Sequence, residues 1–365
     1  MYKDNQIFVK LEEGLLEPFS TTISVKQGCV LSPIIFNLYI NKICSIFDQS
    51  CMPVKINDIE LNCLLWADDL LLISESAEGL QNCINKMSTF YENLDLKVNI
   101  KKTKVIIFNR RGVTLGNKFE FFLNGEKLAV TDCYQYLGLK IRPSGCLAHA
   151  VNELNDKAQR AWFGISNIVH KNKRMEPGRV FQLLDSLVTP VALYGCEFWI
   201  PFLIQSKGLT SIEKLLSSWE SMKFEQINQK CSRMILSVHN KSSRLAVLGE
   251  LGRYPLFINA LTQCLKYRIS LLKRKASNPL ISNMLVEMSQ MAEKGHDCWL
   301  LRVTKIGLQN EIGMNNTSSK IRSKFDAFWL TQNNSVKNQK GDLTDHNKLR
   351  TYKSFKATFS LEPYI

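Results

Sequence analysis

The hydrophobic pattern of the first 145 residues changes repeatedly between short strand-like blocks and single helices. Residues 6–11 and 19–25 alternate as paired strands do, and apolar positions from Pro33 to Asp48 recur at helical spacing. Ser32 and Pro33 supply a cap and a first-turn proline for that helix. The pattern also predicts an amphipathic helix over 77–94. Further strands are predicted within 56–65, at 105–108 and at 134–141. Two more, at 119–123 and 127–130, lie on either side of the hairpin signal Asn124-Gly125.

From Leu147 onward the periodicity is helical. It predicts helices over 147–170, 177–200, 207–238, 244–252, 255–275 and 279–294, with weaker ones to about 330. The final residues are rich in Asn, Gln, Lys and Asp, which is typical of a flexible segment. We therefore expect an α+β fold, divided into a mixed domain at 1–145, a helical domain at 146–240, a helical C-terminal region at 241–330 and a polar tail at 331–365.

Two adjacent carboxylates, Asp68 and Asp69, interrupt a long apolar run between Cys63 and Ser74. Aspartate forms turns readily and is a poor strand residue, so the simplest geometry is a hairpin of two mostly buried strands with the carboxylates at its tip. The two charges repel each other unless a cation lies between them, and Mg²⁺ prefers such an oxygen-rich site. The alternative is an ordinary solvated acidic turn.

Composition restricts the possible classes of protein. The chain has 365 residues, of which 45% are hydrophobic and 22% charged, as in globular domains. It has no run of 18 or more apolar residues, so we expect no transmembrane helix, and residues 1–5 lack the apolar core of a signal peptide. The 11 cysteines are scattered without Cys-x-x-Cys pairs. A reducing, intracellular location in cytoplasm or nucleus, without secretion, is therefore expected.

The net positive charge lies in the helical part of the chain. Residues 1–145 contain 16 lysines and arginines and 16 aspartates and glutamates, so the net charge of +14 lies entirely in the remainder. A basic helical region beside a neutral region that holds the carboxylates favours a polyanionic partner. The alternative is solvated lysine on helix surfaces.

The order of several motifs carries a resemblance to a known family. Gln27-Gly28-x-x-Leu31-Ser32-Pro33 is followed by Trp66-Ala67-Asp68-Asp69, by Asn99-x-x-Lys102-Thr103-Lys104 and by Tyr136-Leu137-Gly138-Leu139. This series closely resembles the palm of reverse transcriptases encoded by non-LTR (LINE-type) retrotransposons. Residues 193–199 and 250–256 are similar to the region that follows the palm, and the resemblance covers roughly 1–310.

The resemblance implies a function and its partners. The chain is identified as a fragment of an RNA-directed DNA polymerase, whose family joins nucleotides to a primer 3′-hydroxyl by two-metal nucleotidyl transfer. The expected partners are an RNA template and a DNA primer, with no membrane, and the expected cofactor is Mg²⁺, with Mn²⁺ as an alternative. Residues 1–145 would be a partial palm, with an antiparallel sheet and packed helices, and residues 146–240 a thumb.

The resemblance also assigns roles to individual residues. Asp68 and Asp69 would hold the metals, and Lys102 would act near the triphosphate with Lys104 nearby. The template and nucleotide pocket would include Gln27, Gly28, Ser32, Trp66 and Ala67, and primer support would come from Tyr136, Leu137 and Gly138. The lysines could also be a solvated loop, Tyr136 a core strand residue and Ser32 only a helix cap. Trp66 replaces the family's usual Tyr or Phe, and Asp95 replaces a common glycine.

One catalytic group of the family is not found. Two-metal chemistry needs carboxylates on both sides of the metals, and the family takes one from an apolar strand upstream of the Gln-Gly motif. The acids before Gln27 are Asp4, Glu12, Glu13 and Glu17, and none ends such a strand. We therefore expect that the first catalytic Asp and the fingers belong to a missing N-terminal part and that residues 1–365 alone do not polymerise.

Three hypotheses follow for this chain. It is a reverse transcriptase fragment that acts only together with the missing N-terminal part, or a non-catalytic remnant that still binds nucleic acid, or a poorly folded relic. An incomplete palm sheet would leave an unpaired strand edge, which puts the fold at risk.

Overall fold

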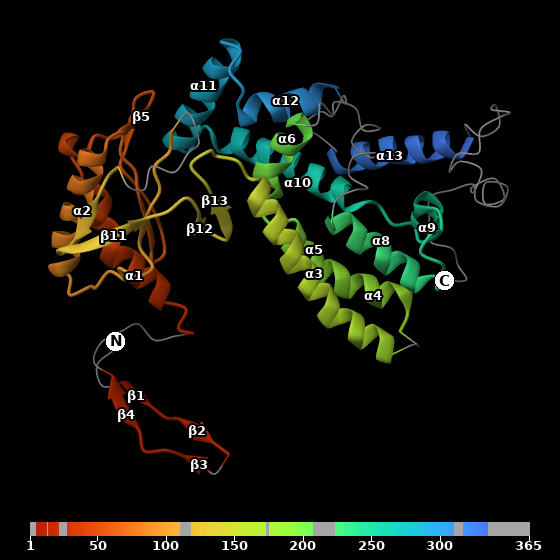
Figure 1. The fold of residues 1–365 in the computed structure, drawn as a ribbon, viewed down its shortest axis with the longest axis horizontal. Helices are drawn as coiled ribbons and strands as arrows, with labels where there is room; N and C mark the ends of the chain where they lie inside the picture. Colours follow the sequence, from red (N-terminus) through yellow and green to blue (C-terminus); the bar gives the residue numbers. More distant parts are fainter. Residues whose placement is uncertain are drawn as a thin grey trace. The chain divides into compact units, whose positions relative to one another are not determined.

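The chain folds into two compact units. The computed structural model describes residues 5–12, 14–21, 28–109, 118–172, 175–206, 223–309 and 317–334. The first unit contains the described residues up to Ile107 and residues 118–132, and the second contains 108–109 and the described residues from Cys133 onward. The first combines short strands with helices, and the second joins many helices to a β-hairpin (Figure 1). The predicted α+β class is confirmed, whereas the boundaries at 145, 240 and 330 stay predictions.

The first strands form a narrow antiparallel ribbon. Strand β1 (Asn5–Ile7) pairs with β4 (Phe19–Thr21), and β2 (Lys10–Leu11) pairs with β3 (Gly14–Leu15). This agrees with the strand pair expected from the sequence. Every described side chain from Gln6 to Ser20 is exposed, so the ribbon adds nothing to the buried core.

The helix expected at 33–48 is shorter than the pattern indicated. Helix α1 (Ser32–Ile40) gives way to the 3₁₀ segment η1 (Asn41–Ser45), and a second 3₁₀ turn, η2 (Gln49–Cys51), follows. The expectation that Ser32 caps this helix is wrong, because Leu31 is the N-cap and no side chain caps it. Proline is accommodated in a first turn, whose N–H groups are unpaired in any case, so the helix begins one residue earlier.

Two β-hairpins follow in sequence. Strand β5 (Val54–Ile56) pairs with β6 (Ile59–Leu61), and β7 (Cys63–Trp66) pairs with β8 (Asp69–Leu72). The hairpin predicted around the two aspartates is therefore present. The expectation that its strands are mostly buried is wrong, because only Cys63 is buried and the leucines are half-buried. Among the described residues the two strands pair with each other alone, and the face that carries Leu65, Leu70 and Leu72 is the one that packs on the core.

The core of the first unit lies between α2 (Ala77–Glu92) and a three-stranded sheet. The strand order is β10 (Phe121–Leu123), β11 (Glu126–Val130) and β9 (Lys104–Val105). The buried residues are Ile43, Ile84, Met87, Val105, Phe121, Leu123 and Leu128. The predicted hairpin at Asn124-Gly125 is confirmed, with φ of 52° and 80° at the two turn residues.

Gly79, in the first turn of α2, provides a first testable prediction. A Cβ at this position would lie 2.5 Å from Ser74 Oγ and 2.7 Å from the Cys51 carbonyl oxygen. We expect Gly79→Ala to lower the free energy of unfolding by about 1–3 kcal/mol, measured by urea denaturation. Gly164→Ala in the helical unit is the control, because nothing lies within 4 Å of that position. Equal effects of the two substitutions would contradict the close approach at Gly79.

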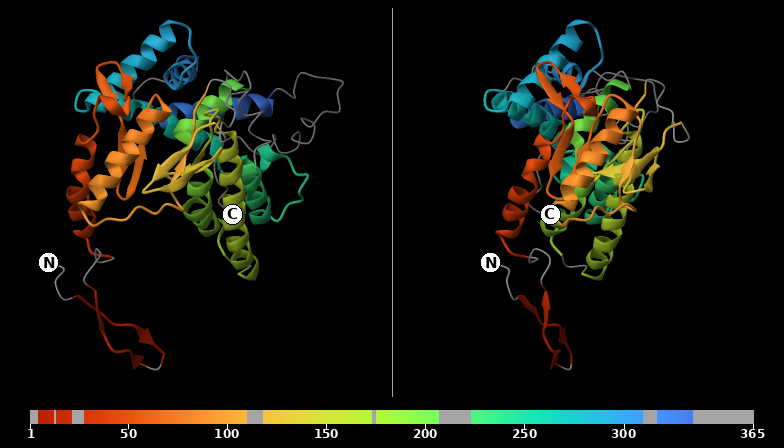
Figure 2. Two further views of the ribbon diagram at one scale, coloured as in Figure 1. Left: turned by 60° about the vertical axis from the view of Figure 1, so that its left-hand side comes forward. Right: turned by 90° about the vertical axis from the view of Figure 1, so that its left-hand side faces the viewer.

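The second unit consists mainly of helices (Figures 1 and 2). They are α3 (Ala148–Lys171), α4 (Pro177–Leu183), the π-helical segment η3 (Leu184–Val188), α5 (Thr189–Ala192), α6 (Cys196–Ser206), α8 (Lys223–Ile235), α9 (Arg244–Glu250), α10 (Leu256–Arg274), α11 (Pro279–Glu293), α12 (Trp299–Gln309) and α13 (Thr317–Asn334). Helix α10 is central and packs against α6, α8, α11, α12 and α13. Its residues Phe257, Ile258, Leu261 and Cys264 are fully buried.

The helix predictions hold in outline, with three differences. The helix expected over 177–200 is interrupted between α5 and α6, around Tyr194. Residues 207–222 of another expected helix lie outside the described residues. Helix α13 continues to Asn334, past the expected start of the flexible tail at 331, and residues 335–365 lie outside the described residues.

Within the described residues, no single helix has the length and apolar character needed to cross a membrane. Residues Pro177–Ala192 and Cys196–Ile204 reach that length only together, as a pair bent by 71°. Both segments contribute buried residues to the core of the helical unit, among them Val188 and Trp199.

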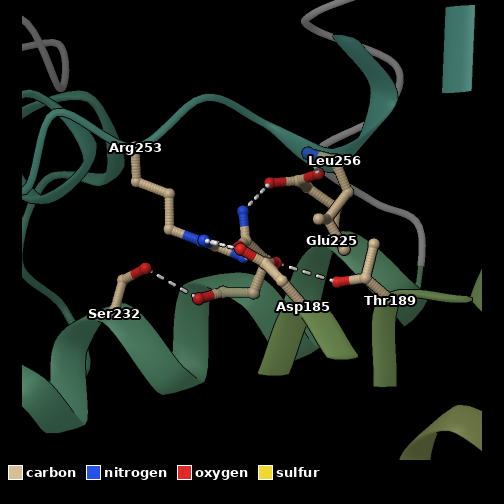
Figure 3. Close-up of polar contacts among 7 residues, drawn as sticks. Asp185, Thr189, Glu225, Ser232, Arg253 and Leu256 are labelled. Carbon is tan, nitrogen blue, oxygen red and sulfur yellow. Dashed lines mark hydrogen bonds and ion pairs between the residues drawn. The ribbon is translucent and has the colours of Figure 1, made fainter. Parts of the chain in front are cut away.

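A polar network around the buried residues Glu225 and Asn228 connects α8, η3 and the start of α10 (Figure 3). Arg253 forms a bidentate ion pair with Asp185, at 2.8 Å and 3.1 Å, and its Nε donates to Asn228 Oδ1. Asn228 Nδ2 donates to Glu225 Oε1 at 3.0 Å, and the backbone N–H of Leu256 donates to Glu225 Oε2 at 2.8 Å. Burial raises the pKa of Glu225 to about 7. The network fixes the start of α10 against α8.

Candidate active site

The tip of the β7–β8 hairpin presents both aspartates to solvent. A two-residue turn, Ala67-Asp68, joins the strands, and Asp69 pairs across them with Trp66. Ala67 has a φ of 52°, a left-handed conformation that favours glycine and is found in tight hairpin turns. Residues 66–69 are all exposed. Cross-strand partners share a face, so Asp69 lies beside Trp66 on the face opposite the core-packed Leu65 and Leu70.

The two carboxylates form an incomplete set of metal ligands. Adjacent exposed carboxylates suit a hard divalent cation, because such ions take oxygen ligands. In the described part of the chain, however, no third His, Cys, Asp or Glu gathers with them into a group that could hold a metal ion. A two-metal centre therefore requires a further ligand beyond those that these residues provide.

The segment at 99–104 is a turn organised by Asn99. The backbone N–H of Lys102 donates to Asn99 Oδ1 at 3.1 Å, and the Thr103 hydroxyl donates to the Asn99 carbonyl oxygen at 2.9 Å. Lys102 and Lys104 are exposed. The sequence motif indicated the lysines, and the structure adds that Asn99 shapes the turn that carries them.

The Gln-Gly motif is described only in part. Gln27 lies outside the described residues, whereas Gly28 has a φ of 78°, which strongly favours glycine. Ser32 is only 4% exposed at the start of α1, so its hydroxyl is enclosed by protein and does not line an open surface. Asp95, which stands where glycine was expected, adopts a φ of 54° and so keeps the local backbone in a conformation that glycine prefers.

Comparison with known proteins identifies this region. Residues 3–141 match the family model for reverse transcriptase (RNA-dependent DNA polymerase). The chain contains a reverse transcriptase domain. This agrees with the motif order Gln-Gly, Ala-Asp-Asp and Tyr-Leu-Gly in the sequence. Reverse transcriptases as a family use divalent metal ions and act on nucleic-acid templates and primers.

The curated relatives include proteins of R2 retrotransposable elements. The chain is 28% identical over 151 residues to the Retrovirus-related Pol polyprotein from type-2 retrotransposable element R2DM of Drosophila melanogaster. This match covers 40% of the chain and 14% of that protein. It is 26% identical over 179 residues to the type-1 R2 Pol polyprotein of Popillia japonica, covering 47% of the chain and 24% of the relative. The chain thus spans no more than about a quarter of either relative, and the similarity supports a reverse transcriptase of the non-LTR class.

The last motif of the reverse transcriptase domain forms a hairpin in the helical unit. The apolar pattern predicted one strand over 134–141 with a mid-strand glycine, and this is wrong, whereas the family resemblance had matched residues 136–138 to a hairpin. Strand β12 (Tyr134–Tyr136) pairs with β13 (Leu139–Ile141) around the turn Leu137-Gly138, whose φ angles are 44° and 85°. Two positive φ angles match the right-handed twist of paired strands. Tyr136 is half-buried, and Leu137 and Gly138 are exposed.

The predicted site residues thus divide between the two units. Gly28, Ser32, Trp66, Ala67, Asp68, Asp69 and Lys102 belong to the first unit, and Tyr136, Leu137 and Gly138 belong to the second. Sequence reasoning assigned no role to Tyr194, although it lies in a motif that resembles the family, and the structure places it against the β12–β13 turn.

Proposed function

We propose that this chain supplies the metal-binding hairpin, the primer-supporting hairpin and the thumb of a non-LTR retrotransposon reverse transcriptase. The observation that carries the proposal is the exposed Asp68-Asp69 pair at the tip of a tight hairpin within the reverse transcriptase domain. The reaction is transfer of a nucleotide to the 3′-hydroxyl of a DNA primer on an RNA template. Asp68 and Asp69 hold Mg²⁺, or alternatively Mn²⁺, and Lys102 offsets charge on the leaving group.

The other predicted residues shape the surroundings of this chemistry. Gln27, Gly28 and Ser32 set the loop and helix start beside the template, with Trp66 and Ala67 next to the metal ligands. The thumb, at 146–240, tracks the duplex through basic side chains, and Arg160, His170 and Lys171 are exposed on α3.

We further propose that this polypeptide needs the remaining N-terminal reverse transcriptase segment for catalysis. Helix α1 and the residues before it expose an apolar surface, with Val30 at 85% and Leu38 at 72% exposure and Leu31, Ile34 and Ile35 alongside. The β7–β8 hairpin also has no third strand among the described residues. Exposed apolar surface and free strand edges are features that proteins normally cover. A palm segment that brings the third carboxylate would cover both.

Primer extension tests the proposal. Residues 1–365 are compared with the same residues fused behind the fingers and first palm segment of the Drosophila melanogaster R2 protein, on an RNA template with Mg²⁺. We expect extension by the fusion only, and none by a fusion that carries Asp68→Ala and Asp69→Ala.

The other outcomes point elsewhere. Extension by residues 1–365 alone that the double substitution abolishes would refute the need for a further segment and direct attention to Asp4, Glu12, Glu13 and Glu17. A fusion that binds the template in a salt-dependent way without extending the primer would favour the second candidate, a non-catalytic nucleic-acid-binding remnant. The incomplete ligand set and the basic helical unit favour that candidate.

A further inference from the structure

We infer that Tyr194 is a positioning residue that holds the β12–β13 hairpin in its primer-supporting conformation. The inference rests on the proposed role of that hairpin and deepens it. Tyr194 lies between the end of α5 and the start of α6, where the apolar pattern predicted an unbroken helix. At this break Tyr194 reaches the hairpin.

The contact is a hydrogen bond to the strained residue of the turn. The Tyr194 hydroxyl donates to the Leu137 carbonyl oxygen at 2.8 Å, across 57 residues of sequence. Leu137 has a φ of 44°, which is costly for a residue with a large side chain. The hydrogen bond offsets part of this cost and so favours the observed turn over alternatives.

Two glycines make the contact reciprocal. A Cβ on Gly138 would lie 2.8 Å from Cε1 of the Tyr194 ring, and a Cβ on Gly195 would lie 2.8 Å from Leu139 Cδ1. Each segment thus uses a glycine to admit a side chain of the other. Close approach of this kind fixes the hairpin in one place, because shifting it brings atoms into collision.

Both sides of the contact are anchored. Trp199, which is 1% exposed, donates from its Nε1 to the Tyr194 carbonyl oxygen at 3.0 Å. Lys140 on β13 forms a 3.0 Å ion pair with Glu153 on α3. A two-stranded hairpin is marginally stable by itself, so its conformation depends on such supports.

The contact fixes the turn and leaves it accessible. Tyr194 is 48% exposed and Leu137 is 38% exposed, so both side chains remain accessible to a ligand. A surface that holds a primer end must be accessible to the primer. It must also be fixed in position, because small misplacements of a reacting group lower the reaction rate strongly. A contact that served stability alone would be expected in the buried core.

Tyr194→Phe in the full 365-residue chain tests the inference. Loss of one hydrogen bond is expected to speed amide hydrogen exchange at 134–141 roughly two- to ten-fold. The matched control is Tyr39→Phe, which removes a 3.0 Å hydrogen bond from a tyrosine hydroxyl to the Leu94 carbonyl oxygen and leaves this hairpin alone. Photo-crosslinking from a 4-thiothymidine at the primer 3′ end to residues 134–141 is measured in parallel, with total primer–template affinity.

We expect Tyr194→Phe to lower the crosslink yield several-fold while the total affinity is unchanged. Unchanged hydrogen exchange would overturn the contact, and faster exchange with unchanged crosslinking would overturn the positioning role. Absence of the crosslink in the unmodified chain would instead refute primer support by this hairpin, and with it the proposed function of these residues.

A second pair of variants separates the reciprocal contact from turn strain. Gly138→Ala and Gly125→Ala each add a Cβ at the second position of a two-residue hairpin turn, where φ is 85° and 80° respectively. The added Cβ meets a side chain at Gly138, whereas nothing lies within 4 Å of it at Gly125. We expect exchange to increase more in 134–141 for Gly138→Ala than in 121–130 for Gly125→Ala. Equal increases would contradict the close packing of Tyr194.

Discussion

Asp68→Asn is expected to slow Mg²⁺-dependent primer extension by roughly three to four orders of magnitude in the completed reverse transcriptase domain. Asparagine keeps the shape of the side chain, but it removes the negative charge that a divalent cation requires. The measurement is single-turnover incorporation of one nucleotide by the fusion with the R2 segment. Because Asp68 is exposed at a hairpin tip, we expect the substitution to leave the fold unchanged.

The chain offers a closely matched control in Asp58. It is the second residue of the two-residue turn between β5 and β6 and follows Asn57, whose φ is 48°. Asp68 has the same place after Ala67, whose φ is 52°. Asp58→Asn removes an exposed charge from the same kind of turn and should leave extension unchanged. A loss for Asp68→Asn that does not exceed the loss for Asp58→Asn would show that Asp68 holds no metal.

Much of the mixed unit could be predicted because its signals are local. A pair of aspartates within an apolar run predicts a turn, because aspartate is a poor strand residue and forms turns readily. The structure has a hairpin there. Asn124-Gly125 supplies two residues that accept positive φ, and α2 has a serine at position 76 that accepts a hydrogen bond from the Gly79 N–H. Local signals of this kind need no knowledge of the rest of the fold.

The missed features depend on contacts between distant segments. The apolar pattern continues through Tyr194 without a break, yet the helix is interrupted where that tyrosine meets the hairpin. Leucine is disfavoured at positive φ, so the strand pattern did not indicate a turn at Leu137, and only the family resemblance matched residues 136–138 to a hairpin. Tertiary contacts decide both cases, and local propensity does not reveal them.

The candidate site shows the same division. The motif order indicated the residue types at 66–69 and at 102, and the hairpin geometry of Asp68 agrees with the expectation. The motif at 250–256 suggested only kinship with the family. In the structure it places Arg253 and the start of α10 against the buried carboxylate of Glu225. A helical pattern predicts that a position faces the core, but it does not show which distant groups will satisfy a buried charge.

Removal of that carboxylate is expected to have a large effect on stability. Glu225→Ala leaves Asn228 Nδ2 and the Leu256 N–H without their acceptor in a buried setting. We expect the free energy of unfolding to fall by about 2–6 kcal/mol, because each of the two buried donors left without a partner costs about 1–3 kcal/mol. Urea denaturation measures this, with Glu293→Ala on exposed α11 as a control that should change stability by less than about 0.5 kcal/mol. A comparable small effect for Glu225→Ala would contradict the network.

The same carboxyl should also make stability depend on pH. Burial raises the pKa of Glu225 to about 7 from an ordinary value of 4.5, although hydrogen bonds from Asn228 and from backbone N–H groups, with the charge of Arg253, act to lower it. The folded state therefore binds this proton more tightly than the unfolded state does. The resulting stabilisation is fully present below the unfolded pKa and is lost as pH rises through the folded pKa.

Glu225→Gln isolates this effect, because glutamine is nearly isosteric and does not titrate. Between about pH 5 and pH 8, we expect the unmodified protein to lose on the order of 3 kcal/mol of unfolding free energy relative to Glu225→Gln. All other titrating groups are common to the two proteins and cancel in the difference. Parallel pH profiles of the two proteins would show that Glu225 has the same pKa in the folded and the unfolded state. If the unmodified protein instead gained stability relative to Glu225→Gln as pH rises, the folded state would favour the charged carboxylate. Only the expected sign is consistent with a carboxyl that the helical core holds partly protonated near neutral pH, because desolvation outweighs its hydrogen bonds there.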